Sequence, residues 1–345
     1  MRALLLSGTG GLDRLAPGDI PRPVLSEPGD VRVRLRATAL NRLDLWVAGG
    51  VPGVTYSFPH VIGSDGAGTV EETGPGVAAF AVGDRVLINP GVSCGRCEWC
   101  LGGEQPLCPS FGVLGEHRPG TMAEEIVVPD RNLAHLPAGL SWIQAAALPL
   151  ATITAWRMLT TRAGVGPGET VLIWGIGGGV ALAALKIARL LGARVIVTSG
   201  SDEKLARARA LGAELGINHA TEDVPGRVKQ FTGRRGAEVV IDSVGERTWE
   251  RSLRSLARRG RLVVCGASSG PMVTTDLRRM FWFQWSLLGS TMGSDAEFRA
   301  VVAEAAGGRL LPEIDSVHSF ADAIAAFRRL ESGAQFGKIV VEMPV

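Results

Sequence analysis

The stretch Val171–Thr198, VLIWGIGGGVALAALKIARLLGARVIVT, contains the pattern that decides the fold. It begins with an apolar run, Val171–Trp174, and ends with a β-branched run that closes at Thr198. Between them lie a glycine turn and an apolar segment of helical length. Buried parallel strands have continuous apolar runs of this kind, bounded by Gly. The pattern predicts a strand, turn, helix and second strand at the start of a doubly wound α/β domain.

The glycine turn Gly175–Gly179 lies between the predicted strand and the predicted helix. Backbone N–H groups at a helix N-terminus bind a pyrophosphate, and the helix dipole favours its negative charge. A glycine turn alone is a weak signal, but a strand before it and a helix after it make it specific. We therefore predict a dinucleotide site, against the alternative of a turn without ligand. Its expected residues are Gly175, Gly178, Gly179, Val180 and, at the end of a later strand, Gly266.

The composition narrows the class of protein. A chain of 345 residues suits two domains, and its net charge of +2 implies neither a nucleic-acid partner nor an anionic membrane. It has no apolar run of about 18 residues, and its apolar start is too short for a signal peptide. Four of the five cysteines fall within fifteen residues, which is typical of metal ligation in a reducing compartment. We expect a soluble, cytoplasmic protein.

The chain divides into two parts with different sequence patterns. Up to about Pro137 short runs alternate with Gly and Pro, which predicts a mostly antiparallel β domain with strands at Val31–Ala37, Gly66–Glu72, Arg85–Asn89 and Glu124–Val128. From about Leu148 the pattern predicts further helices at Glu203–Leu211 and Thr248–Ala257, and strands at Glu238–Asp242, Arg261–Gly266 and Leu287–Thr291. Two more helices, Asp295–Ala306 and Ser319–Ser332, precede an expected last strand, Lys338–Met343.

The cysteines Cys94, Cys97, Cys100 and Cys108 follow the spacing C-x2-C-x2-C-x7-C. Four thiolates this close in sequence can surround one ion tetrahedrally, and an all-thiolate set favours zinc. Such a closed site leaves no open position for a substrate, so we predict a structural zinc. Free surface thiols and an iron–sulfur cluster are the alternatives.

Several motifs together resemble the medium-chain dehydrogenase/reductase superfamily over essentially the whole chain. They are GSDGAGTVEETGPGV (63–77), GDRV (83–86), the cysteine motif, GTMAEEIVVP (120–129), ALPLATITAW (147–156), the glycine turn and FGKIVVEM (336–343). The resemblance implies a GroES-like, mostly-β domain formed by residues 1–147 and 292–345, with the zinc lobe at 94–108. It implies a Rossmann domain at residues 148–291.

Zinc alcohol dehydrogenases of this superfamily carry a second, catalytic zinc on a Cys, a His followed by Glu, and a third Cys or acid. The matching positions here are Asn41, Ser64 followed by Asp65, and Leu150. Amide, hydroxyl and leucine side chains do not replace thiolate and imidazole around zinc. The resemblance therefore implies that the catalytic zinc is absent. ALNRLDLW and AALPLATITAW are instead similar to the quinone oxidoreductase branch, which works without it, although most members of that branch lack the cysteine lobe.

Cofactor choice depends on the end of the second strand. NAD recognition normally uses an acid about twenty residues after the first glycine, and none lies there. Ser199 and Ser201, with Lys204 one turn further, suit a 2′-phosphate. We predict NADPH in preference to NADH. In the alternative interpretation, Ser201 only caps the next helix and Lys204 is solvated.

The expected reaction is hydride transfer from NADPH to a quinone or an α,β-unsaturated carbonyl. Asn41 is expected to donate its amide to the developing oxyanion or to hold the nicotinamide ribose, and Thr154 to contact the nicotinamide ring or ribose. Asp44 is expected to orient its neighbours, and Tyr56 to protonate an enolate. An ordinary structural role is the alternative for each of them. The five histidines have no spacing that predicts a second metal site.

Two other functions stay open. One is a zinc-type alcohol dehydrogenase in which Asp65 and further ligands retain zinc, and the other is a non-catalytic NADPH-binding or redox-sensing protein. The expected partners are a small-molecule substrate and further copies of the chain, as a homodimer or homotetramer.

Overall fold

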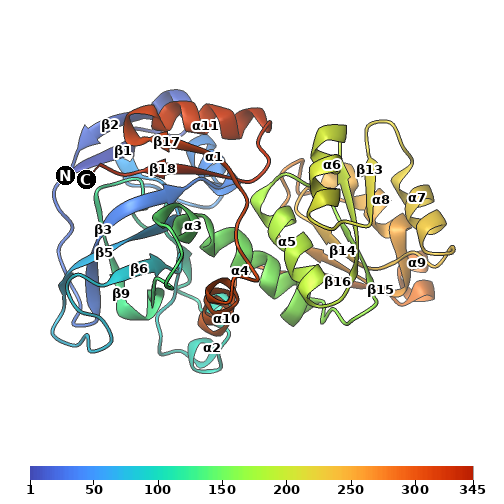
Figure 1. Cartoon of the computed structure of the whole chain (residues 1–345), viewed down its shortest axis with the longest axis horizontal. Coiled ribbons are helices and arrows are strands. Elements are labelled where there is room, and N and C mark those ends of the chain that lie inside the picture. The colour runs from blue at the N-terminus through green and yellow to red at the C-terminus, as the bar shows by residue number, and fades with distance from the viewer. Residues whose placement is uncertain (345) are drawn as a thin grey trace. The chain divides into compact units, whose positions relative to one another are not determined.

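The computed structural model describes residues 1–344 and divides into two compact units (Figure 1). Unit 1 combines Met1–Ala151 with the segment from Gly293 onward, and unit 2 is Thr152–Met292. The first boundary falls inside helix α4 (Pro149–Arg157). Each unit has its own sheet and core, so each is described by itself.

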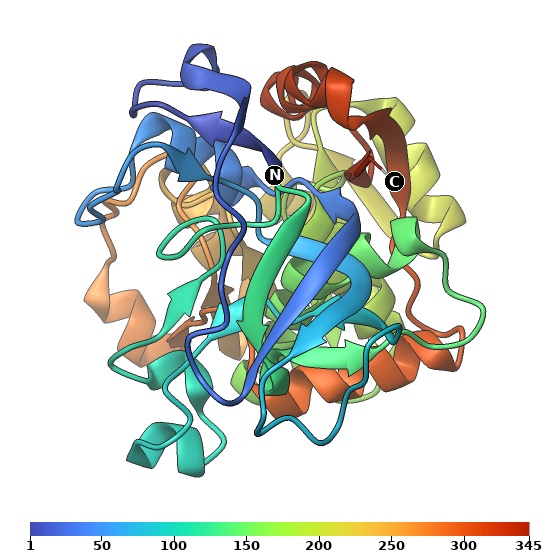
Figure 2. The same cartoon turned by 90° about the vertical axis from the view of Figure 1, so that its left-hand side faces the viewer.

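Unit 1 is built on a seven-stranded sheet in the order β10-β6-β5-β3-β18-β17, with β9 also paired to β3. Its strands are β3 (Asp30–Ala39), β5 (Asp65–Thr73), β6 (Arg85–Ile88), β9 (Glu125–Pro129), β10 (Leu133–His135), β17 (Ile314–Ser319) and β18 (Lys338–Glu342). Strand β18 follows unit 2 in the chain and pairs antiparallel with β3, Val341 opposite Thr38. Figure 2 faces this sheet and shows β3 (blue) beside β9 (green).

The remaining strands of unit 1 form a small sheet β2-β1-β4 and a hairpin β7-β8. Their bounds are β1 (Arg2–Leu6), β2 (Leu15–Asp19), β4 (His60–Val61), β7 (Gly91–Val92) and β8 (Gly112–Val113). The helices are α1 (Arg42–Gly49), α2 (Glu98–Leu101), α3 (Trp142–Ala147), α10 (Asp295–Ala306) and α11 (Ala323–Ser332). Val31, Val33 and Leu35 of β3 are buried, as the alternation predicts, and Phe327 of α11 joins the same core.

Unit 2 is a six-stranded parallel sheet in the order β13-β12-β11-β14-β15-β16. Its strands are β11 (Thr170–Ile173), β12 (Arg194–Ser199), β13 (Leu215–Asn218), β14 (Ala237–Asp242), β15 (Leu256–Val264) and β16 (Ser286–Gly289). Its helices are α5 (Gly179–Leu190), α6 (Asp202–Ala210), α7 (Val224–Phe231), α8 (Glu246–Ser255) and α9 (Leu277–Phe283), after a π-helical turn at Met158–Arg162. This confirms the predicted doubly wound α/β domain.

The elements differ from the predictions in a few places. The helix predicted over Ser319–Ser332 begins only at Ala323, because Ser319 ends strand β17 and its hydroxyl accepts the Asp322 N–H. Strand β13 and helices α7 and α9 have no counterpart among the predicted elements, since they are short and α7 carries Pro and Gly. In unit 1 the same holds for strands β1, β2, β4, β7, β8, β10 and β17. Within residues 1–344, no helix is long and apolar enough to cross a membrane.

Candidate functional site

The glycine turn of unit 2 leads from the end of β11 into helix α5. Gly175 and Gly177 have φ of 69° and 121°, which only glycine adopts without strain. Gly175 N donates to Thr198 Oγ1 at 3.2 Å and Ile176 N to Thr198 O at 2.8 Å, so the turn is tied to strand β12. Gly178 is the N-cap of α5 and presents no side chain there. The turn and the start of α5 therefore form a pocket of backbone amides suited to a phosphate.

The predicted cofactor residues lie at one edge of this parallel sheet. The glycine turn follows β11, Ser199 ends β12, and Gly266 lies two residues beyond β15. Strand β11 lies between β12 and β14, where the chain order reverses, and dinucleotides bind at the carboxyl ends of strands at this point. Val180 belongs to the first turn of α5.

The end of β12 is closed by hydroxyl groups. Ser199 Oγ accepts from Ser201 N at 3.1 Å, and Ser201 Oγ accepts from Lys204 N at 3.4 Å. Ser201 is therefore the N-cap of α6, as the alternative interpretation predicts. Strand β12, RVIVTS, carries no carboxylate, and that of Asp202 accepts from Asn218 Nδ2 at 2.8 Å.

Trp174, His219 and Arg251, to which the sequence analysis gave no role, lie beside the end of β12. His219 Nδ1 is 3.4 Å from Thr198 Oγ1, and its Nε2 lies 3.5 Å from where a Cβ on Gly200 would be. Arg251 Nη1 donates to His219 O at 3.3 Å, and its guanidinium lies over the Trp174 ring, 5.1 Å from the centroid. Burial and the Arg251 charge lower the pKa of His219. In the sequence, Trp174 directly follows β11, His219 directly follows β13 and Arg251 lies on α8. These positions were the one signal that could have indicated them.

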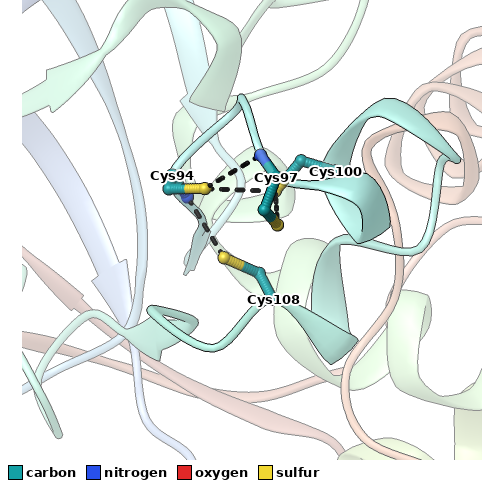
Figure 3. A group of neighbouring side chains, drawn as sticks. All are labelled: Cys94, Cys97, Cys100 and Cys108. Carbon is teal, nitrogen blue, oxygen red and sulfur yellow. Dashed lines mark hydrogen bonds between the residues drawn. The ribbon is translucent and has the colours of Figure 1, made fainter.

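The four cysteines of unit 1 point toward one another (Figure 3). Their sulfur atoms all lie within 4.8 Å of one another, and Cys94 Sγ and Cys97 Sγ are 3.8 and 3.5 Å from Cys100 Sγ. Backbone N–H groups of Arg96 and Cys97 lower the pKa of the Cys94 thiol to about 6. Among residues 1–344, this is the one group of three or more His, Cys, Asp and Glu side chains that could hold a metal ion.

A second polar cluster is buried in unit 1 around Asp65, at the start of β5. Its carboxylate accepts the Leu150 N–H on Oδ1 at 2.7 Å, and on Oδ2 both Asn41 Nδ2 and Lys338 Nζ, each at 2.9 Å. Lys338 Nζ also donates to Asn41 Oδ1 at 2.5 Å. Asp65 is fully buried and Lys338 nearly so, and removal of either charge would leave the other unpaired inside the protein.

Asp44 borders the same cluster, from the first turn of helix α1. Its Oδ2 accepts Asn41 N at 2.7 Å in a capping box, while its Oδ1 has no hydrogen-bond partner in the described chain. Burial raises the pKa of Asp44 to about 7, although the Lys338 charge acts in the opposite direction. Ser64, the residue before Asp65, likewise has a buried hydroxyl that finds no partner within residues 1–344.

Comparison with known proteins identifies the family. Residues 27–138 match the alcohol dehydrogenase GroES-like domain, and residues 179–307 match the zinc-binding dehydrogenase domain. A zinc-type alcohol dehydrogenase-like protein of Schizosaccharomyces pombe is 34% identical over 99% of both chains. The chain belongs to the medium-chain dehydrogenase/reductase superfamily. It is an NAD(P)-dependent oxidoreductase of the kind that acts on small molecules.

Other relatives of this dehydrogenase/reductase bear different names. A quinone oxidoreductase of Pseudomonas aeruginosa is 33% identical, over 93% of each chain. A solved structure described as an NAD-dependent alcohol dehydrogenase superposes with a TM-score of 0.96 at 46% identity, over 100% of both chains. The chain therefore has the GroES-like and Rossmann-type domains of the family. Its relatives are named for different reactions, so their names do not identify the acceptor.

The Asp65 cluster also fixes the surroundings of Asn41. Asn41 Nδ2 donates both to Asp65 Oδ2 and, at 3.3 Å, to Ala39 O, so both of its amide N–H groups have acceptors within the protein. Its expected role as a donor to a substrate oxyanion stays a prediction. Its Oδ1 keeps one lone pair beside the Lys338 contact, and a contact with the nicotinamide ribose stays a prediction.

The other two predicted residues lie in different surroundings. Thr154 is buried in α4, with its hydroxyl 3.9 Å from Met292 Sδ. Tyr56 is partly exposed, its ring centroid lies 5.2 Å from that of His60, and its hydroxyl is one of the buried groups for which the described residues supply no partner. Burial is the main cause that raises the pKa of Tyr56. Their roles toward cofactor and substrate stay predictions.

Proposed function

We propose that this enzyme transfers hydride from NADPH to a quinone or an α,β-unsaturated carbonyl, without a catalytic zinc. The observation that carries the proposal is the Asp65 cluster. At the positions where zinc alcohol dehydrogenases carry ligands, Asn41, Ser64 and Leu150 offer no thiolate or imidazole. The one carboxylate beside them, Asp65, already accepts three N–H donors. A donor set of this kind does not fit zinc.

A donor set that does not fit zinc favours one class of hydride acceptor. A catalytic zinc polarises a simple carbonyl, and the residues at the matching positions of this chain supply no such Lewis acid. A conjugated acceptor delocalises the incoming charge over its own π system, so it depends less on a Lewis acid. Bound NADPH supplies the hydride, and the protein's part is to position the acceptor and to exclude water.

Two features support NADPH over NADH. Strand β12 itself carries no carboxylate to bond a ribose 2′-hydroxyl, and the Asp202 carboxylate at the start of α6 accepts from Asn218 Nδ2. The cation Arg251 and the imidazole of His219 lie beside that strand end, together with the hydroxyls of Ser199 and Ser201. A 2′-phosphate placed there would meet donors and positive charge.

We also propose that the four cysteines hold a structural zinc. Zinc–sulfur bonds of about 2.3 Å in a tetrahedron place the sulfur atoms about 3.8 Å apart. The separations of 3.8 and 3.5 Å fit that geometry, so Cys94, Cys97, Cys100 and Cys108 would hold the ion. With four protein ligands it would stabilise the lobe and take no part in the reaction.

The deciding experiment combines activity with metal analysis on one sample. We expect one zinc per chain, and reduction of quinones or enones with NADPH preferred over NADH. Two zinc ions per chain together with alcohol oxidation would instead establish the zinc-type alcohol dehydrogenase, which the names of several relatives favour. Tight NADPH binding with no turnover across a broad panel of acceptors would point to a binding or redox-sensing protein.

We further propose a homodimer formed through the edge strand β16 and helix α9. Strand β16 ends the sheet of unit 2, and α9 before it exposes Leu277, Phe281 and Trp282. Large apolar side chains grouped on a surface usually mark an interface. Light scattering would show twice the chain mass, and replacing Phe281 and Trp282 by Ser would yield monomers.

A further inference from the structure

Unit 1 contains a cavity of about 690 Å³. Two loops, residues 55–61 and 114–120, form its walls together with Met1, Ile20 and part of β9. Most of the lining is apolar, with a few polar groups among it. This volume and composition are typical of small-molecule sites.

The wall formed by loop 114–120 packs on the chain just before Ser64. Gly120 N donates to Val61 O at 2.8 Å, and Thr121 N donates to Gly63 O at 2.9 Å. A Cβ on Gly115 would lie 2.4 Å from Gly63 O, so the two segments touch through their backbones. The cavity wall is therefore continuous with the segment that carries Ser64 and Asp65.

Two adjacent titratable side chains lie on that wall, Glu116 and His117. His117 Nδ1 is 3.4 Å from Glu116 Oε2 and 3.3 Å from Val113 N. When Nδ1 is protonated it can pair with Glu116, both in the imidazolium and in the neutral imidazole that remains after Nε2 gives up its proton, and when Nδ1 is unprotonated it can accept the Val113 N–H. The side chain of Glu116 is 13% exposed and that of His117 is 42% exposed. Burial raises the pKa of Glu116, partly offset by His117.

The other titratable groups around the cavity are less suited to give up a proton. His60 is buried and its Nε2 is bonded to Gly115 O at 2.9 Å. Tyr56 has a pKa raised by burial and by the Glu116 charge, and Glu125 is paired with the three arginine side chains Arg22, Arg32 and Arg34. Among the histidines that line the cavity, His117 is the one with an exposed ring.

Given the proposed function, we infer that this cavity binds an α,β-unsaturated carbonyl acceptor and that His117, oriented by Glu116, protonates its α carbon. Hydride enters the β carbon, and the C=C electron pair moves to leave an enolate. The enolate α carbon then takes the proton from Nε2 of the imidazolium, which leaves neutral imidazole and the saturated carbonyl. Solvent returns a proton to His117 before the next turnover.

The inference selects enones over quinones as the acceptors that need this group. A reduced quinone collects its protons on oxygen, where water delivers them rapidly. Protonation on carbon is slow without a positioned acid, and general acid catalysis contributes about 10²–10⁴-fold. Loss of the acid should therefore affect enone reduction and spare quinone reduction.

The test compares His117→Gln with His135→Gln, a matched change at an exposed histidine whose ring bonds Ala79 O away from the cavity. We expect His117→Gln to lower kcat for an enone by about a hundredfold or more relative to kcat for a quinone. His135→Gln should leave both rates unchanged. Equal rates in His117→Gln and wild type, or an equal loss with both acceptors, would overturn the inference.

Two further readouts keep the test decisive. In D₂O the wild type should deuterate one face of the α carbon, and His117→Gln should give both epimers. Glu116→Gln keeps His117 but removes the carboxylate that orients it, so it should reduce the facial selectivity of deuteration less than His117→Gln does. Turnover of quinones alone by the wild type would refute the inferred acceptor and leave the proposed function standing, whereas turnover of neither acceptor would refute the proposed function itself.

Discussion

Replacing Asp44 by Asn should stabilise unit 1 at neutral and alkaline pH. Asp44 is 1% exposed, and its burial raises its pKa from 3.8 to about 7. One carboxylate oxygen accepts the Asn41 N–H, while the other has no partner in the part of the chain that the structure describes. An Asn amide keeps the oxygen that caps α1 and carries no charge to bury.

The size of the expected stabilisation follows from the pKa shift of Asp44. A folded-state pKa about three units above the unfolded value corresponds to about 4 kcal/mol, at about 1.36 kcal/mol per unit. Between pH 4 and pH 7 the folded protein keeps a proton that the unfolded chain has lost. The free energy of unfolding therefore falls as pH rises through this window, by up to about 1.4 kcal/mol per pH unit. In Asp44→Asn that part of the pH dependence disappears.

Hydrogen exchange of peptides from β3 and β5 would report the stability of unit 1 separately from that of unit 2. The measured quantity is the difference in unfolding free energy between wild type and Asp44→Asn at pH 5, 6, 7 and 8. Asp13→Asn, at a carboxylate that is 87% exposed, serves as the control and should show no such trend. A difference that stays constant from pH 5 to 8 would mean that Asp44 ionises normally and would refute the reasoning.

Three further changes test other parts of the molecule. Lys338→Met leaves Asp65 buried without its counterion and should destabilise unit 1 by about 3–5 kcal/mol in the same exchange measurement, whereas Lys229→Met, at an exposed position of unit 2, should have little effect. Cys108→Ser should abolish zinc binding in an elemental assay, because three thiolates no longer close the site. Gly200→Asp has room for its Cβ and places a carboxylate at the end of β12. At about 5 Å and an effective dielectric constant of about 20, the repulsion of a 2′-phosphate is about 3 kcal/mol, so kcat/KM for NADPH should fall roughly a hundredfold relative to NADH.

Local patterns were sufficient to predict five of the six strands in the sheet of unit 2 and, in unit 1, strands β3, β5, β6, β9 and β18. The apolar runs before and after the glycine turn became β11 and β12, and the alternating run Val31–Ala37 lies within β3. The four cysteines are close in sequence, so their spacing alone indicated that they meet in space. In each of these cases the interacting residues are neighbours in the chain or repeat with a fixed period.

The polar cluster could not be predicted in the same way. Lys338 and Asp65 are 273 positions apart, and their contact depends on the pairing of β18 with β3. The one signal was that Lys338 is among only four lysines in an arginine-rich chain. The surroundings of Asn41 could not be predicted for the same reason, since the acceptors of its amide N–H groups become known only when the sheet is assembled.

The placement of β18 also determines when unit 1 can be completed during synthesis. A ribosome finishes residues 1–151 and then the whole of unit 2 before it makes the strand that lies between β3 and β17. Domains usually fold in the order in which they are made. Here the nascent chain must hold β3 with an open edge, and Asp65 without Lys338, until residues 338–342 emerge. Unit 2, whose strands are contiguous in the chain, can fold first, and a ribosome that stalls before residue 338 would expose an unpaired edge of β3 to other chains.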